Sequence, residues 1–451
     1  MRFQTINPAT NKVIRTYTYQ DKTTLLAALE TADSTFRTWR NTAFSERKDC
    51  LNRLAALTEE NLDELAALIT QEMGKPITEA RSEIKKCASL CRYYAETGEA
   101  LLQPKSIKTD NAKSYVRFDP LGVVLGIMPW NFPFWQVYRY AVPTLFAGNT
   151  TLLKHAPNTT GSGLRTAELF AEAGFPKGAF QTILADTDDI PTLIQDRRIQ
   201  GVTLTGSERA GASVAAQAGS DLKKTVLELG GSDPFIVLAD ADLKEAAKVG
   251  AQARLMNTGQ SCIAAKRFLV EEGVADAFLE LLEAEMTKRK PDDPTNENTQ
   301  LGCLARADLS DKLEEQIRNS VKAGAKLHTG GVRDGNFFTP AILTHVKPGM
   351  PAYTEEFFGP VAIFMTFKDE DELLHIANAT EYGLGAALWT QDIPRAERLA
   401  RHIESGSVFV NQLVRSDPKL PFGGVKRSGY GRELSEWGIR EFTNIKTVAI
   451  A

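Results

Sequence analysis

The sequence predicts an α/β protein with two domains, each built around a parallel β-sheet. The first observation is length, because 451 residues exceed what one hydrophobic core ordinarily organises. The second is a rhythm that begins near Leu121, where short apolar runs alternate with amphipathic stretches of about ten to fifteen residues. The third is another series of this kind that begins near Pro234. Such alternation is typical of βαβ units, whose strands lie parallel.

The region before the first sheet is predicted to be helical. From about Asp21 to Leu102, apolar residues recur every three or four positions, which is the period of an amphipathic helix. The triplet Gly74-Lys75-Pro76 interrupts this pattern and indicates a helix end. The strands expected after this region are the apolar runs VVLGI, TTLLK, FQTIL, GVTLT and TVLEL.

The second series predicts further strands and helices. It begins with the strand PFIVL at Pro234 and continues with a helix over 243–256, the strand RFLV, and a long helix from Val274 to about Lys290. Residues 103–117 mix Lys, Ser, Thr and Val without a helical period, which suits an exposed hairpin. The C-terminal segment FTNIKTVAI is predicted to be a strand.

Charge and composition argue against several classes of partner. A net charge of −4 leaves no basic excess to attract nucleic acid. The longest apolar stretch, residues 121–135, is interrupted by two prolines and falls short of the ~20 residues that cross a bilayer, so no membrane partner is expected. The N-terminus MRFQTINPATNK has neither a signal core nor a presequence pattern, which favours the cytoplasm.

The cysteines are expected to be free thiols in a reducing compartment. They form no CxxC pair and have no histidine partners at zinc-ligand spacing, so no metal site is expected. The five are Cys50, Cys87, Cys91, Cys262 and Cys303.

Cys262 lies in a segment that suits a reactive loop. In NTGQSCIAAKR, Gly259 and Ser261 indicate a turn or loop rather than the middle of an apolar helix. Loops on a rigid scaffold often carry chemistry. The alternative is a buried, unreactive thiol, because free cysteine is among the most buried residue types. The neighbouring residues alone do not decide between these interpretations.

Five segments resemble a known family: PWNFP (129–133), LELGG (227–231), GQSC (259–262), EEFFGPV (355–361) and PFGGVKRSGYGREL (421–434). They occur in the order typical of the aldehyde dehydrogenase superfamily and span nearly the whole chain. Within that superfamily the chain is most similar to bacterial succinate-semialdehyde dehydrogenases, including the ending NQLVRSDPKLPFGGVKRSGYGREL. The resemblance implies an aldehyde dehydrogenase-like α/β fold, with two Rossmann-type domains on parallel sheets plus a small β oligomerisation arm.

The resemblance also divides the chain. It implies a cofactor-binding domain at 1–102 and 119–229, a catalytic domain at 230–435, and an oligomerisation arm at 103–118 and 436–451. Such an arm implies a homodimer or a homotetramer.

Aldehyde oxidation by hydride transfer requires a tetrahedral adduct first, because a free aldehyde that lost hydride would leave an acylium ion. A thiolate forms that adduct, and water cleaves the resulting thioester if a base activates the water. The resemblance implies Cys262 as the nucleophile and Glu228 as the general base. It implies Asn131 as the oxyanion donor, together with the backbone N–H of Cys262.

Asn131 and Glu228 also have simpler interpretations. An asparagine between prolines is a common turn former. A glutamate on an alternating strand commonly faces solvent.

The cofactor implied by the resemblance is NAD or NADP, although no GxGxxG fingerprint follows a strand. Lys154 matches the lysine that meets the adenosine ribose, and Glu356 the carboxylate that holds the nicotinamide ribose. The turn before the next helix would present backbone amides to a phosphate. The implied cofactor-binding residues are Trp130, Lys154, Pro157, Thr205, Gly206, Ser207, Glu356 and Phe358.

Pro157 departs from the pattern of NAD-preferring relatives, many of which carry a glutamate there. Proline neither accepts a hydrogen bond from the ribose hydroxyls nor pairs with a 2′-phosphate. The choice between NAD and NADP therefore stays open.

The substrate implied by the resemblance is an aldehyde that bears a carboxylate. Arg139 matches the arginine that grips this group, since a guanidinium binds a carboxylate in a bidentate manner; an ion pair within the protein is the alternative. Met256 stands where these enzymes often carry a second arginine, and Arg415 is a candidate replacement. The implied substrate-binding residues are Trp135, Arg139, Arg415, Ser416 and Phe422.

Other functions stay open at this point. A broad-specificity enzyme for uncharged aldehydes would share the same nucleophile. A thiol acyl-transferase or esterase would need a histidine base, and none lies in the motifs around Cys262. A non-enzymatic protein could have kept the fold as a binding module. Glu433 matches a family glutamate assigned to proton relay, and a structural salt bridge is its alternative.

Overall fold

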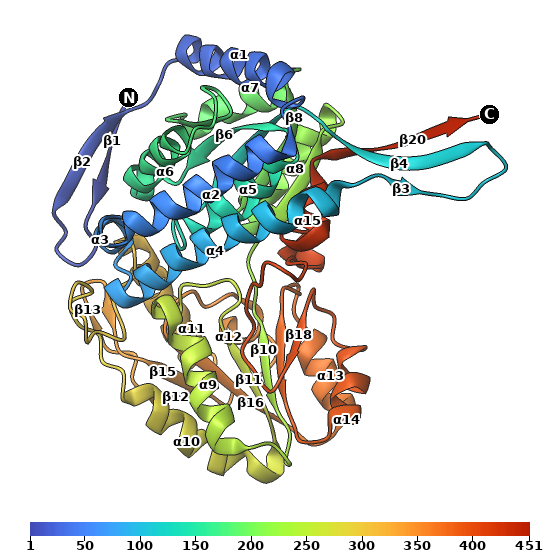
Figure 1. Ribbon diagram of the computed structural model, residues 1–451. Helices are drawn as coiled ribbons and strands as arrows, with labels where there is room; N and C mark the ends of the chain where they lie inside the picture. The colour runs from blue at the N-terminus through green and yellow to red at the C-terminus, as the bar shows by residue number, and fades with distance from the viewer.

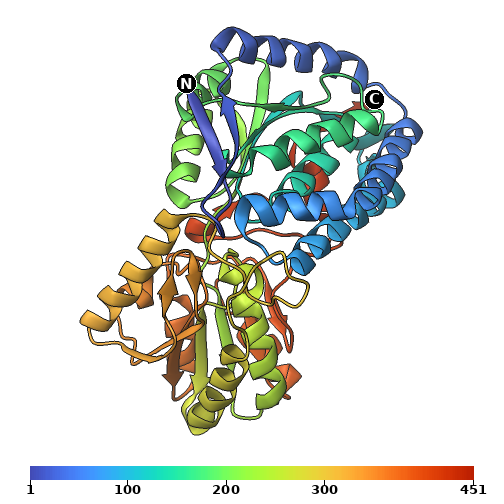
Figure 2. The same ribbon diagram turned by 90° about the vertical axis from the view of Figure 1, so that its left-hand side faces the viewer.

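The computed structural model describes residues 1–451 as two α/β bodies with a narrow arm that projects from the upper one (Figure 1). Turned by 90°, the bodies remain two separate masses joined near the middle (Figure 2). A short hairpin, β1 (Arg2–Ile6) with β2 (Val13–Thr18), lies along the side of the upper body. None of the helices combines the length and apolar composition that crossing a bilayer requires.

Four helices precede the first sheet, as the apolar period predicts. They are α1 (Lys22–Trp39), α2 (Phe44–Glu60), α3 (Leu62–Met73) and α4 (Ile77–Leu102). Asp21 begins α1 by accepting a hydrogen bond from the N–H of Thr24 at 2.8 Å. Helix α3 ends at Gly74, whose φ of 76° is the left-handed conformation that favours glycine. The predicted stop at Gly74-Lys75-Pro76 is confirmed.

The upper body is built around six strands in the order β19-β9-β8-β5-β6-β7. All pairs are parallel except β19 with β9. The strands are β5 (Val123–Met128), β6 (Thr150–His155), β7 (Phe180–Ile183), β8 (Ile199–Thr205), β9 (Lys224–Glu228) and β19 (Gly429–Tyr430). Their crossover helices are α5 (Trp135–Phe146), α6 (Thr160–Glu172), α7 (Ile190–Gln195) and α8 (Glu208–Ser220). The predicted strand–helix alternation is confirmed, because buried parallel strands need such crossovers.

The lower body holds seven strands in the order β12-β15-β16-β11-β10-β17-β18. Only β12 runs antiparallel to its neighbour. The strands are β10 (Pro234–Val237), β11 (Arg267–Glu271), β12 (Lys326–Thr329), β15 (Ala341–Thr344), β16 (Val361–Phe367), β17 (Ala386–Trp389) and β18 (Val408–Val410). The main helices are α9 (Leu243–Leu255), α10 (Ala275–Thr287), α11 (Ala307–Lys322), α13 (Glu370–Asn378) and α14 (Ile393–Ala400).

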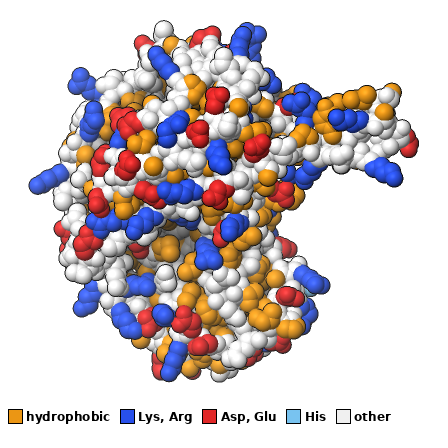
Figure 3. Space-filling model, in the orientation of Figure 1, with side chains coloured by type: hydrophobic (Ala, Val, Ile, Leu, Met, Phe, Trp, Pro, Cys, Tyr) orange, Lys and Arg blue, Asp and Glu red, His pale blue; other side chains and the backbone are white.

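The arm is a three-stranded antiparallel sheet of β3 (Lys105–Ser106), β4 (Lys113–Pro120) and β20 (Thr443–Ile450). The predicted hairpin and C-terminal strand therefore pair with each other. Helix α15 (Ser435–Glu441) packs against α4 and α5, and the C-terminal strand of the arm follows it from Thr443. Hydrophobic side chains lie exposed along the arm (Figure 3), among them Ile107, Ile445 and Ile450.

Loops at the ends of the upper strands point to the junction of the two bodies. The carboxyl ends of β5, β8 and β9 lie on one edge, since these strands are parallel. Asn131 lies in the loop after β5, and Thr205 and Glu228 are the last residues of β8 and β9. The segment between α9 and β11 brings Cys262 to the same place from the lower body. The fold thus gathers residues from both bodies at one junction.

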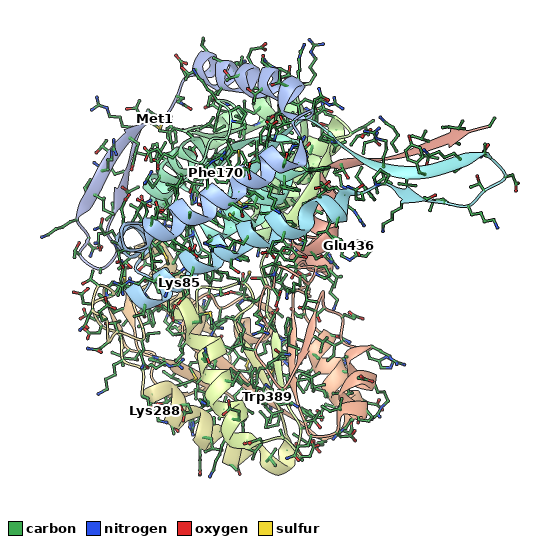
Figure 4. The ribbon with its side chains drawn as sticks, in the orientation of Figure 1. Met1, Lys85, Phe170, Lys288, Trp389 and Glu436 are labelled. Atoms are coloured by element: carbon green, nitrogen blue, oxygen red, sulfur yellow. The ribbon has the colours of Figure 1, made fainter.

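Phe170 of α6 lies inside the upper body, among packed side chains (Figure 4), with 1% of its surface exposed. Its ring stacks on Phe180 with 4.3 Å between centroids, and it also packs against Phe175 and Tyr138. This aromatic cluster packs α6 against β7 and α5.

We predict that Phe170→Ala lowers the free energy of unfolding by about 3–5 kcal/mol, because the cluster cannot close around the cavity left behind. Urea denaturation followed by tryptophan fluorescence measures the loss. Trp437→Ala is the matched control, since that ring is 59% exposed. A midpoint for Phe170→Ala equal to that of the control would contradict this packing.

Candidate active site

Two cavities meet at Cys262, which lines both. The wider cavity has a volume of about 510 Å³ and is bordered by α4, α5 and residues 413–416. The second cavity has a volume of about 400 Å³ and lies between the strand ends of the upper body and α11 of the lower body. A thiol at this meeting point reaches ligands in either cavity.

The loop that presents Cys262 has an unusual backbone. Asn257, Thr258 and Gly259 follow α9 with φ of 54°, 55° and 75°, all in the left-handed region. Two successive non-glycine residues there cost about 1–2 kcal/mol each, so the surroundings must hold them. Arg254 does so in part by donating a hydrogen bond to the carbonyl of Gly259 at 2.6 Å. The thiol itself is partly buried.

Asn131 sits beside this loop and is 5% exposed. Its side-chain Nδ2 donates to the carbonyl of Gln260 at 3.1 Å. Its own carbonyl accepts from Nδ2 of Asn257 at 2.8 Å and from Nζ of Lys75 at 2.9 Å. The amide group of Asn131 is therefore held beside the loop that carries Cys262, and both residues line the second cavity.

A buried ion pair supports the Asn131 loop from below. Lys75 and Glu83 pair with both side chains about 1% exposed. Glu83 Oε1 also accepts from the backbone N–H groups of Phe134 and Trp135, at 2.9 and 3.0 Å. A carboxylate at those amides suits the start of α5, because the first N–H groups of a helix lack partners within it. One side chain thus holds the loop and α5 together.

Glu228 ends β9 and is 2% exposed, so it does not face solvent. Neither carboxylate oxygen has a hydrogen-bond partner within the protein. Burial raises the pKa of Glu228 well above its usual range, and Glu433 raises it further, while Arg139 opposes the shift. Glu228 lines neither cavity, although its charge also acts on Cys262.

Burial raises the pKa of the Cys262 thiol to about 12, while the positive charges of Lys266 and Arg139 oppose that rise. Lys266 Nζ donates to the carbonyl of Cys262 at 2.7 Å and pairs with Glu356 at 2.9 Å. Burial thus favours the neutral form of both groups, and attack requires that the thiol lose its proton.

Arg139 lines the wider cavity from α5 and is 2% exposed. It forms an ion pair with Glu433, and its guanidinium lies 4.5 Å from the ring centroid of Phe422. Its Nη2 has no hydrogen-bond partner. Arg139 and Glu433 thus form the structural ion pair that was the alternative interpretation for each of them. The pair leaves Nη2 of Arg139 available to another acceptor.

All the predicted substrate-binding residues line the wider cavity, as does Met256. They come from two places, α5 for Trp135 and Arg139, and residues 415–422 for Arg415, Ser416 and Phe422.

The motifs did not identify Lys86 of α4, which lines the same cavity. Its ammonium lies 4.1 Å from the ring centroid of Trp135 and donates to Ser416 Oγ at 2.6 Å. Nothing in the sequence around Lys86 distinguishes it from Lys85, which is exposed on the same helix.

All eight predicted cofactor-binding residues line the second cavity, together with Arg306 and Lys312, which the motifs did not reveal. Ser207 caps α8 through a hydrogen bond from the N–H of Ala210, so the first turn of α8 opens on this cavity. The buried hydroxyl of Thr205 has no partner, and a Cβ at Gly206 would meet only Leu204. These groups fit a phosphate, because free donors at a helix N-terminus favour an anion.

The other end of the second cavity suits a nicotinamide riboside. Glu356 accepts from the N–H of Gly231 at 3.1 Å, and Phe358 lies edge-on to Trp130 with 5.8 Å between ring centroids. The carboxylate of Glu356 can accept hydrogen bonds from ribose hydroxyls, and it lines the same cavity as Phe358, Trp130 and Cys262. The residues present fit a dinucleotide.

The chain belongs to the aldehyde dehydrogenase family, whose family model matches residues 1–448. It is 48% identical to a Synechocystis protein named "Probable succinate-semialdehyde dehydrogenase (NADP+)", over 100% of both chains. It is 46% identical to the succinate semialdehyde dehydrogenase (NAD(P)+) Sad of Escherichia coli K12, over 98% of this chain and 96% of that one.

Solved structures agree with this family. The crystal structure of succinic semialdehyde dehydrogenase from Streptococcus pyogenes in complex with NADP+ aligns with a TM-score of 0.97 and 38% identity, over 99% of each chain. The family resemblance and the fold class predicted from the sequence are therefore confirmed.

We predict that Glu83→Ala destabilises the protein by about 3–5 kcal/mol, because it leaves the Lys75 ammonium buried without a counter-charge. The rate of aldehyde oxidation should fall with it, since the Asn131 loop loses its support. Urea denaturation and steady-state kinetics measure the two effects. Glu96→Ala removes an exposed carboxylate from the same helix and serves as the control. Equal stability of the two variants would show that the pair is not required.

Proposed function

We propose that this chain oxidises succinate semialdehyde to succinate with NADP or NAD as the oxidant. The supporting observation is the wider cavity, which has the Cys262 thiol in one wall and the cations Arg139, Lys86 and Arg415 in others. An aldehyde with a terminal carboxylate fits this arrangement, since its two ends match a nucleophile and a cation. The relatives named above carry the same activity in their names.

The first step is addition of the Cys262 thiolate to the aldehyde carbon. A C–S bond forms, and the carbonyl π electrons move to oxygen. The Nδ2 of Asn131 and the backbone N–H of Cys262 donate hydrogen bonds to that oxygen. Lys266 and Arg139 favour the thiolate, because both oppose the effect of burial on its pKa.

Glu356 and Phe358 would hold a nicotinamide riboside in the second cavity, and this group would supply the acceptor for the hydride that the adduct loses. The carbonyl re-forms as a thioester of Cys262. Glu228 then removes a proton from water as the water attacks, and the C–S bond breaks to release the acid and the thiol. The carboxylate of Glu228 must turn toward Cys262 for this step, since it lines neither cavity. Its raised pKa suits a base that takes a proton.

A broad-specificity aldehyde dehydrogenase is the second candidate. Trp135, Phe132 and Phe422 give the wider cavity apolar surface that would accept an uncharged chain. Lys86 weighs against it, because its partly buried ammonium is paired with no carboxylate and a neutral substrate would leave it without a counter-charge. A histidine-dependent esterase is less well supported, since no histidine lines either cavity.

We further propose that assembly as a homodimer or homotetramer uses the arm. The arm projects from the upper body and exposes Ile445 and Ile450 on β20 and Ile107 just after β3. Exposed apolar side chains on a free sheet edge suit a second copy of the chain.

We predict that Cys262→Ala abolishes aldehyde-dependent reduction of the cofactor. Asn131→Ala should lower kcat by about 10²–10³-fold, since one oxyanion donor is lost. Glu228→Gln should give a burst of reduced cofactor close to one equivalent and then turn over slowly, because the thioester is not hydrolysed. Absorbance of the reduced cofactor measures all three. Cys50→Ala, a thiol of α2, is the control. Undiminished reduction by Cys262→Ala would refute the mechanism.

We predict that kcat/KM is higher for NADP than for NAD. Pro157 provides no carboxylate to repel a 2′-phosphate, and Lys154 brings a positive charge to the same end of the second cavity. Lys154→Met should lower kcat/KM for NADP about tenfold or more, and less for NAD, because one charge-assisted contact is lost. Pro157→Glu should shift the preference toward NAD. Lys22→Met is the exposed control. If Lys154→Met lowered kcat/KM equally for NADP and NAD, Lys154 would not be a contact of the 2′-phosphate.

A further inference from the structure

The wider cavity contains cations whose charges are balanced unequally. Glu83 forms an ion pair with Lys75, and Arg139 forms an ion pair with Glu433. Lys86, in contrast, has no carboxylate within ion-pairing distance. Its side chain lies between α4 and α5, with only part of its surface exposed. A partly buried ammonium without an anion is costly unless a ligand supplies the charge.

The contacts of Lys86 hold it in place without neutralising it. Its Nζ lies 4.1 Å from the Trp135 ring centroid, which is a cation–π distance. One N–H donates to Ser416 Oγ at 2.6 Å, which leaves the hydroxyl proton of Ser416 available for another acceptor. Ser416 is 7% exposed, and its Oγ has no other partner. The ammonium and the hydroxyl therefore form a ready pair of donors.

We propose that Lys86 is a specificity determinant for the carboxylate end of the substrate, acting with Ser416 and the free edge of Arg139. This assignment rests on the proposed function and adds to it, because the carboxylate would accept from Lys86 Nζ and from the Ser416 hydroxyl together. The thiol lies in the wall of the same cavity, so the aldehyde end of a short chain reaches Cys262. Lys86 thereby supplies a positive charge in a cavity that has Met256 in place of a second arginine.

Electrostatics agree with this geometry. Burial, together with the nearby Arg139, lowers the pKa of Lys86 to about 8. Cys87 and Glu83 on the same helix oppose the shift, as does Asp417. An arriving carboxylate would favour the ammonium, since opposite charges at short range stabilise the charged form. Substrate binding should thus depend on pH through this group.

The test compares succinate semialdehyde with butanal, which has the same chain length and no carboxylate. In Lys86→Met, KM for succinate semialdehyde should rise about ten- to a hundredfold, as expected for a lost charge-assisted hydrogen bond. KM for butanal should change far less, and kcat should fall less than KM rises. Lys86→Arg should restore most of the preference. Lys85→Met is the control, because it removes the same charge from an exposed position on α4.

A pH profile separates binding from structural support. For the native enzyme, the ratio of kcat/KM for succinate semialdehyde to that for butanal should fall as pH rises through about 8, because the ammonium loses its proton. Cys262 affects both aldehydes and cancels from this ratio. In Lys86→Arg the ratio should stay level over the same range, since arginine does not titrate there.

Two results would overturn the assignment while leaving the proposed function intact. One is an equal rise in KM for both aldehydes in Lys86→Met. The other is a native-like preference in that variant, with thermal denaturation showing a folded protein. If instead the native enzyme does not prefer succinate semialdehyde to butanal, the proposed function itself fails and the role of Lys86 fails with it.

Discussion

The site depends on the buried ion pair between Lys75 and Glu83. Lys75 donates to the carbonyl of Asn131, and Glu83 accepts from the first amides of α5. The Asn131 carbonyl also accepts from Asn257, which begins the left-handed turn before Cys262. Asn131 and the Cys262 loop, to which we assign the oxyanion donor and the nucleophile, thus share one hydrogen-bonded network. Removing either charge would leave the other buried and unpaired, which is why such a pair constrains its surroundings.

This network also orients the substrate cavity. Because Glu83 fixes the start of α5, it fixes Trp135 in the first turn and Arg139 one turn later. Glu433 holds Arg139 from the C-terminal region, and Ser416 comes from the same part of the chain. The walls of the cavity therefore come from α4 and α5 of the upper body, from the Cys262 loop of the lower body, and from residues 413–422. Small shifts of α5 would move the nucleophile's neighbours and the carboxylate's partners together.

Low polarity sets the protonation states at the junction. Burial raises the pKa values of Cys262 and Glu228 and lowers that of Lys86, so each group is driven toward its neutral form. The cations near the thiol oppose this effect. A bound substrate carboxylate or cofactor would change the charge around these groups. Their ionisation would therefore depend on whether the site is occupied.

Much of this protein could be predicted from the order of its residues. Local periodicity identified the helices before β5, the parallel strands of the upper sheet, β10 and β11 of the lower sheet, and the terminal strand, because these depend on near neighbours in the chain. Spaced motifs indicated Cys262, Asn131 and Glu228, and the residues around the second cavity. Helix α15 was not predicted, since this short helix is held by packing against α4 and α5.

Contacts between distant segments required the folded structure. Lys86 reads as an ordinary helical lysine until Trp135 and Ser416 are placed beside it. The partner of Arg139 is 294 positions away in the chain, at Glu433, and no local pattern connects the two. Whether a buried charge is paired or free follows from which elements pack together. Periodicity and motif spacing determine the local elements and the motif residues. Contacts between distant segments, and with them the pairing of buried charges, are decided only by three-dimensional packing.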